Sequence, residues 1–116
     1  MQQREDINKS LLDIREAIES IDGYLSEFLG EKRDFNLYKQ KKFLRRCIER
    51  ELEIIGEAAG RLLLADPDIR IDNARKIVDL RNRIIHGYDK VNDVIIWGIL
   101  FNHLPKLKED IDKLLK

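Results

Sequence analysis

The segment RNRIIHGY at residues 81–88 holds side chains whose types and spacing are suited to chemistry. On a helix of about 100° per residue, Arg81 falls in an otherwise apolar row with Val78. A guanidinium at the edge of a core is costly unless it finds an acidic partner or faces a cleft that holds an anion. His86 lies one turn after Asn82, whose amide is placed to orient the imidazole and select its tautomer. The segment therefore combines an anion-binding cation with a titratable ring.

The spacing of Arg81 and His86 is a difficulty for a shared site. The two residues are about 140° apart around an ideal helix and about 7.5 Å apart along it. They converge only through the length of the arginine or across a partner molecule, so a site at a dimer interface would remove the difficulty. The alternative is a plain helix end, because basic side chains near a C-terminus gain about 0.3–1 kcal/mol and Gly87 is an ordinary cap.

Composition limits what can surround such a site. The 116 residues suit one compact domain, 1–116. Lys+Arg 22 balances Asp+Glu 22, so no overall basic field holds nucleic acid. Cys47 is the sole cysteine and the only histidines are His86 and His103, which leaves no disulfide and no metal site. No apolar run approaches the ~18 residues of a membrane span. We expect a soluble, cytoplasmic protein without cofactor, metal or membrane contact.

Apolar residues recur with helical spacing along nearly the whole chain. Stripes over 7–28, 44–62, 77–84 and 97–114 each define one amphipathic helix, and Pro105 predicts a kink or restart inside the last. The pattern predicts an all-α, up-and-down bundle of four to five helices. The expected boundaries are Gly30 for the first helix, the turn ADPD at 65–68 for the second, Asp72 and Gly87 for the third, and Asn92 for the fourth.

Two features of the second helix stand out. Gly56 and Gly60 lie one turn apart in GEAAG, where each costs roughly 1 kcal/mol relative to alanine, so we expect a neighbouring helix to pack tightly there. Before them, the segment KRDFNLYKQKKFLRR at 32–46 is a basic strip able to neutralise phosphates, although a charged helix face is more often only solvated. Phe35 and Tyr38 are placed to stack on bases, or Phe35 is a buried staple. The candidate RNA contacts are Lys39, Lys41, Lys42, Arg45 and Arg46.

Three segments together resemble a known family. RNRIIHGY matches an R-x-x-x-x-H-x-Y motif, LEIIGEAAGRL occupies 52–62, and the last helix begins with an acidic and tryptophan-bearing segment. The chain resembles HEPN domains of the HepT type over essentially its whole length. One departure is DPDIRIDNARKIVDL, which lacks the proline and tryptophan expected ahead of the third helix in many relatives; the motif itself is intact.

The resemblance implies the toxin half of a toxin–antitoxin pair: a HEPN homodimer that cleaves RNA without metal in a cleft shared by two motifs. It implies catalytic roles for Arg81 and His86, with Asn82 positioning the histidine and Tyr88 contacting the substrate. It also implies a minimal nucleotidyltransferase as antitoxin, which transfers AMP to Tyr88. Two alternatives stay open: Tyr88 packs against the start of the fourth helix, or the chain is a noncatalytic binding module that is the partner or substrate of such an enzyme.

Overall fold

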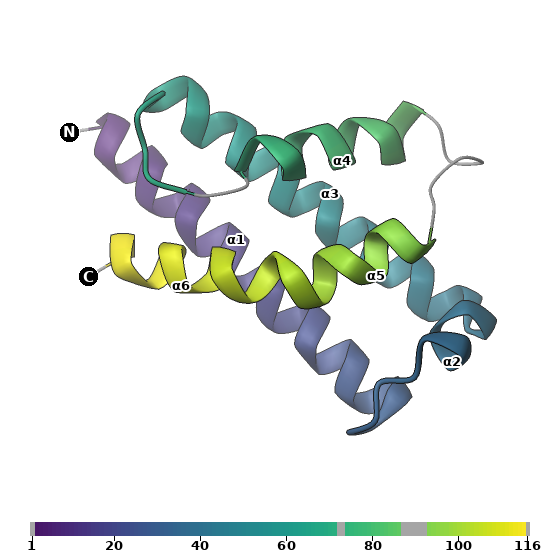
Figure 1. Ribbon diagram of the computed structural model, residues 1–116. Helices are drawn as coiled ribbons and strands as arrows, with labels where there is room; N and C mark the ends of the chain where they lie inside the picture. Colours follow the sequence, from purple (N-terminus) through teal and green to yellow (C-terminus); the bar gives the residue numbers. More distant parts are fainter. Residues whose placement is uncertain (1, 72–73, 87–92, 116) are drawn as a thin grey trace.

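Two long antiparallel helices form the frame of the fold (Figure 1). They are α1 (Gln2–Leu29) and α3 (Lys42–Ala65), and their apolar faces pack against each other along much of their length. The computed structural model describes residues 2–71, 74–86 and 93–115, and the side chains of 2, 3, 74, 80 and 83–86 also lie outside the description. As predicted, α1 ends before Gly30, whose positive φ of 69° suits a residue without a side chain.

A short helix, α2 (Phe35–Gln40), lies between the first two predicted helices, in a segment for which no separate helix was predicted. Asp34 caps it: the backbone N–H of Asn36 donates to Asp34 Oδ1 at 2.7 Å. Tyr38 is fully buried from this helix and packs against Trp97, with ring centroids 5.0 Å apart. The burial of Tyr38 makes α2 part of the core and not a loop.

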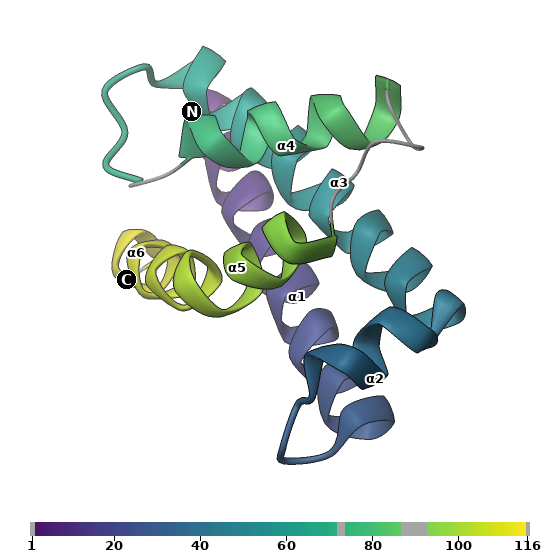
Figure 2. The same cartoon turned by 45° about the vertical axis from the view of Figure 1, so that its right-hand side comes forward.

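Helices α4 (Ala74–His86), α5 (Asp93–Asn102) and α6 (Leu104–Leu115) pack on this frame. α4 lies on α3, and α6 crosses α1 on the side that faces the viewer in Figure 1. Figure 2 shows α5 and α6 following each other across the frame, and α4 and α5 border a common groove. The predicted interruption at Pro105 is confirmed, because the last stripe divides into α5 and α6 at His103. Proline has no N–H to donate to the carbonyl four residues earlier.

The core is a single apolar cluster supplied by every helix. α1 contributes residues such as Leu11 and Ile18, and α3 contributes Ile48 and Ile55, all nearly or completely buried. The predicted all-α bundle is confirmed, with six helices in the described residues since α2 is added and the last stripe is divided. None of the described helices has a stretch long and apolar enough to cross a lipid bilayer.

Candidate functional site

Gly56 lets α4 approach α3 at the position of Arg81. A Cβ on Gly56 would overlap the Cβ of Arg81, and it would lie 2.9 Å from Arg81 Cγ and 3.0 Å from the carbonyl oxygen of Ile77. The prediction of a tightly packed neighbour is therefore confirmed for Gly56. It is wrong for Gly60, where nothing lies within 4 Å of an added Cβ. The first glycine brings the stem of the arginine against the backbone of α3.

Arg81 is half-buried, and its charge is not balanced by an acidic partner within the described part of the chain. Its Nε is buried and has no hydrogen-bond partner there. Its Nη1 donates to Oδ1 of Asn82 at 3.3 Å, so the asparagine contacts the arginine. A buried guanidinium nitrogen normally has a partner, and an anion is the group that would supply one.

The rest of the motif is only partly placed by the structure. His86 is the last residue of α4, five positions after Arg81. Its side chain, and so the predicted contact between Asn82 and the imidazole, lies outside the described residues. The same holds for Gly87 as a cap and for Tyr88 as a substrate contact or a packed side chain. The predicted caps Asp72 and Asn92 also lie outside them.

A charged cluster joins the start of α3 to the start of α5. Arg45 Nη1 lies 3.6 Å from a carboxylate oxygen of Asp93, and Arg46 Nη1 lies 3.8 Å from Oε1 of Glu49. Burial raises the pKa of the Glu49 carboxyl, against the opposing effect of Arg46. Burial, with Asp93 and Glu49 nearby, raises the pKa of the Tyr38 phenol above its usual range. Neither pair was predicted from the sequence. The acidic start of the last helix was the signal for Arg45–Asp93, and the three-residue spacing within one helix was the signal for Arg46–Glu49.

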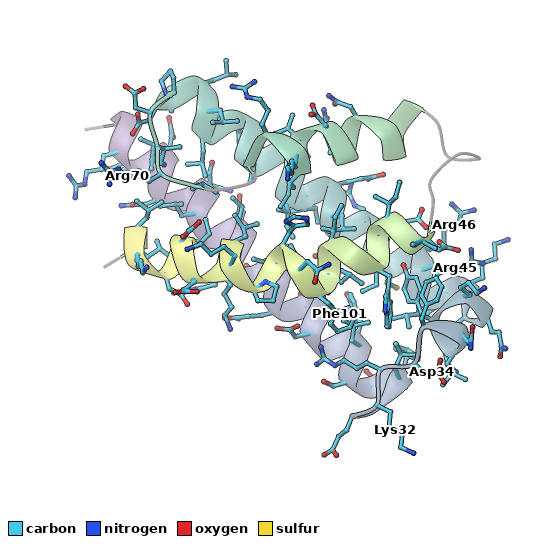
Figure 3. The ribbon with its side chains drawn as sticks, viewed as in Figure 1. Lys32, Asp34, Arg45, Arg46, Arg70 and Phe101 are labelled. Atoms are coloured by element: carbon cyan, nitrogen blue, oxygen red, sulfur yellow. The ribbon has the colours of Figure 1, made fainter. Side chains whose placement is uncertain are left out.

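The residues of the predicted basic strip lie at two separate places in the structure. Figure 3 shows Arg45 and Arg46 beside the start of α5, and Lys32 at the far end, on the turn between α1 and α2. Both arginines already face carboxylates, which weakens the electrostatic attraction that they can exert on a phosphate. Lys39 lies over the ring of Phe35, with 5.3 Å from Nζ to the centroid. The two exposed lysines, Lys39 and Lys42, and the half-buried Lys41 have no ion pair to another described residue.

Two of the aromatic residues of the strip, Phe35 and Tyr38, pack toward the interior, whereas the third, Phe43, is 69% exposed. The prediction that Tyr38 stacks on bases is wrong, because its ring is fully buried among other rings. Phe35 is half-buried and packs against Trp97 at 5.4 Å between centroids, which favours the inward-facing alternative over stacking on bases. Trp97 in turn contacts Phe101 at 4.6 Å. These rings fasten α2 to α5, so stacking on RNA would have to use other residues.

The described side chains contain no group of three or more His, Cys, Asp or Glu residues that could hold a metal ion. What the geometry provides is a cation, Arg81, held by close helix packing one and a half turns before a histidine on the same helix. The family profile described as "Ribonuclease HepT-like" matches residues 14–114, which include all of α4. The chain belongs to the HepT-like family.

Several curated proteins are similar to this HepT-like chain over most of their length. A protein of Thermococcus cleftensis named "Probable ribonuclease HepT" is 34% identical over 110 residues, covering 91% of this chain and 93% of its own. A protein of Methanocaldococcus jannaschii named "Putative RNase MJ1380" is 29% identical over 111 residues, covering 94% and 96%. No solved structure matches the chain significantly. The HepT-like family is thus a nuclease-type family, and these two named relatives match at least 91% of this chain.

Proposed function

We propose that this chain is a metal-independent endoribonuclease, the toxin of a toxin–antitoxin pair, acting in the cytoplasm. The observation that carries the proposal is the guanidinium of Arg81, which is half-buried without an acidic partner in the described residues and shares α4 with His86. A cation in that condition suits an anionic ligand, and a phosphodiester is the anion that a ribonuclease must hold. Membership in a family of named ribonucleases supports the same assignment.

The proposed reaction is an internal transesterification of RNA. The ribose 2′-oxygen forms a bond to the adjacent phosphorus while the bond from phosphorus to the 5′-oxygen breaks, which leaves a 2′,3′-cyclic phosphate and a free 5′-hydroxyl. His86 accepts the proton of the 2′-hydroxyl, and the partner's His86 gives a proton to the leaving 5′-oxygen. Arg81 stabilises the charge that builds up on the phosphoryl oxygens. No electron is transferred and no co-reactant is needed.

The reaction as proposed needs two copies of the chain. Arg81 and His86 are about 140° apart around one α4 helix, so one protomer does not present both to a single phosphate except through the length of the arginine. In a homodimer, the arginine and histidine of two α4 helices face one cleft. Asn82 already contacts Arg81 and would hold the guanidinium in place between turnovers.

Cleavage of RNA in the presence of EDTA tests the activity. We expect His86→Ala to lower the rate about 10²-fold or more, and Arg81→Ala to lower it by about 10²–10³-fold, because they remove proton transfer and charge stabilisation. Arg75→Ala is the matched control: it removes an exposed arginine from the same helix, and the rate should not change. Far-UV circular dichroism must show that all variants are folded. Equal cleavage by wild type and His86→Ala would remove the catalytic assignment.

Control of the toxin is proposed to act on Tyr88. The phenol oxygen would attack the α-phosphate of ATP bound to a minimal nucleotidyltransferase, forming a P–O bond as pyrophosphate leaves and the phenol proton goes to solvent. The added phosphate and base would block RNA by charge and by volume. Co-expression followed by intact-mass measurement tests this: wild type should gain one AMP, and Tyr88→Phe should gain none. A Tyr88→Phe protein that is still modified and silenced would refute the site.

A second candidate is a noncatalytic HEPN module that serves as the partner or substrate of the nucleotidyltransferase. The pairing of Arg45 and Arg46 with carboxylates favours it, since these pairs reduce the local charge available to RNA. If this second candidate is correct, the purified chain binds the nucleotidyltransferase and does not cleave RNA, and His86→Ala leaves the affinity of the complex unchanged.

A further inference from the structure

Helix α5 is apolar on every side, which is unusual for a helix at a surface. Residues 94–102, VIIWGILFN, have no charged side chain in a chain that is 38% charged. Such a helix is normally covered on all sides. Its own chain covers only one side: Ile96 and Leu100 are buried in the core, whereas Val94, Ile95 and Phe101 are exposed.

The exposed side of α5 forms one continuous stripe. Its positions, Val94, Ile95, Gly98, Phe101 and Asn102, follow the three- and four-residue spacing of a helix face. A groove of about 330 Å³ lies between this stripe and α4. Above Gly98 the nearest atom to an added Cβ is Nδ2 of Asn102, at 3.9 Å. No other described element covers that glycine, so another helix has room to approach closely.

We propose that a second copy of this chain docks on this stripe, with α5 against α5 of its partner. An uncharged stripe brings no like charges together when it meets its own copy. Lys76 and Asp79 of α4 border the groove, both are exposed, and neither has an ion pair with another described residue. In a twofold contact each can face the opposite charge of the partner. RNA is a poor occupant, because a polyanion gains no electrostatic attraction from an uncharged surface.

The position of the stripe fits a shared site. Ile95 lines the groove together with Lys76, Ile77 and Asp79 of α4. A copy docked at Ile95 therefore lies beside the helix that carries Arg81 and His86 in both protomers. A specific interface of standard size buries roughly 800 Å² on each partner, about a tenth of the 7527 Å² surface of this chain. The inference rests on the homodimer of the proposed function, and it adds which face makes that dimer.

The molecular mass of the purified protein in solution tests whether this face forms the dimer. Ile95→Lys places a charge at the centre of the stripe, on a side chain that is 44% exposed in the single chain. Leu64→Lys is the matched control, on the end of α3 and 87% exposed. We expect wild type and Leu64→Lys to be dimers by light scattering and Ile95→Lys to be a folded monomer, with at least about a hundredfold weaker association.

Cross-linking gives a second measurement that does not depend on a buried charge. In a Cys47→Ser background, Ile95→Cys should cross-link rapidly with a short bismaleimide, and Leu64→Cys should not. Equal cross-linking of the two variants, or a dimeric Ile95→Lys protein, would overturn the proposed face and leave the dimer standing. A monomeric wild type would overturn both the face and the dimer. Cross-linking of Ile95→Cys only to a different protein would overturn the self-association and show that the stripe binds that protein. A wild-type dimer that cleaves no RNA would remove the proposed activity alone.

Discussion

Replacing Gly56 by alanine isolates the contact that holds Arg81 against α3. Alanine in a helix interior is favoured over glycine by about 1 kcal/mol, so an unobstructed site gains stability. Gly60, one turn later in the same helix, is such a site, since nothing lies within 4 Å of an added methyl. At Gly56 the methyl would meet Cβ and Cγ of Arg81 and the carbonyl of Ile77. Two of these three atoms cannot rotate away, because they belong to the backbone or to the first side-chain carbon.

The expected difference follows from these two effects. Overpacking of a filled site costs about 1–3 kcal/mol, which cancels or exceeds the helix gain at Gly56. We therefore expect Gly60→Ala to raise the free energy of unfolding by about 0.5–1 kcal/mol, and Gly56→Ala to leave it about 1–3 kcal/mol below the Gly60 variant. Urea unfolding followed by circular dichroism measures both, with equal m-values required for the comparison.

A double-mutant cycle identifies the obstructing side chain. Arg81→Gly removes the Cβ and Cγ that an alanine at position 56 would meet, so the two changes together should cost less than the sum of their separate costs by roughly 1 kcal/mol or more. Arg81→Gly combined with Gly60→Ala should be additive. A Gly56→Ala protein as stable as Gly60→Ala, with no coupling to Arg81, would show that α4 does not approach α3 as closely as described.

Three further outcomes are expected. Tyr38→Phe removes a buried hydroxyl that has no partner among the described residues, so the free energy of unfolding should stay equal or rise by up to about 1 kcal/mol in urea titration; a clear loss would reveal a hydrogen bond. Burial raises the pKa of Glu49, so its contribution to stability is present below its unfolded pKa and is lost as pH rises through the folded value. Glu49→Gln should therefore lose less stability than wild type between about pH 4 and pH 7, and identical pH profiles would contradict this. Lys42→Ala should weaken RNA binding and lower the salt slope by about 1, with a smaller effect for Arg46→Ala; unchanged slopes would exclude the lysine from the RNA path.

The sequence predicted those parts of the fold whose signal is periodic. The long stripes of α1 and α3 repeat over many turns, and both helices were predicted, with ends expected at Gly30 and at the turn 65–68; the structure ends them at Leu29 and Ala65. α2 was missed because six residues give only one helical spacing, Phe35 to Tyr38, which does not separate a short helix from a loop. The prediction that Tyr38 stacks on bases was wrong for a related reason, because its burial depends on Trp97, about sixty positions later.

The candidate site was likewise predicted only in part. The types and order of Arg81, Asn82 and His86 are local facts and were available from the sequence. The contact of Arg81 with Gly56 is tertiary: two glycines had equal claims to a close neighbour, and only the crossing point of α3 and α4 separates them. The pairing of Arg45 with Asp93 is tertiary for the same reason, because nothing near the arginine in the sequence specifies a carboxylate on α5.

The antiparallel pair of α1 and α3 also has a consequence for the order in which the protein is made. Chains emerge from the ribosome N-terminus first, at about 5–20 residues per second, and a hairpin of neighbouring helices forms early because its contacts are close in sequence. Residues 2–65, which include the frame of α1 and α3, therefore leave the ribosome before α4. Arg81 emerges after the α3 segment on which it packs, and a nascent chain interrupted before residue 81 contains α1 and α3 without the residues proposed to cut RNA. Translation would thus deliver the residues proposed to cut RNA only after the helices on which they pack.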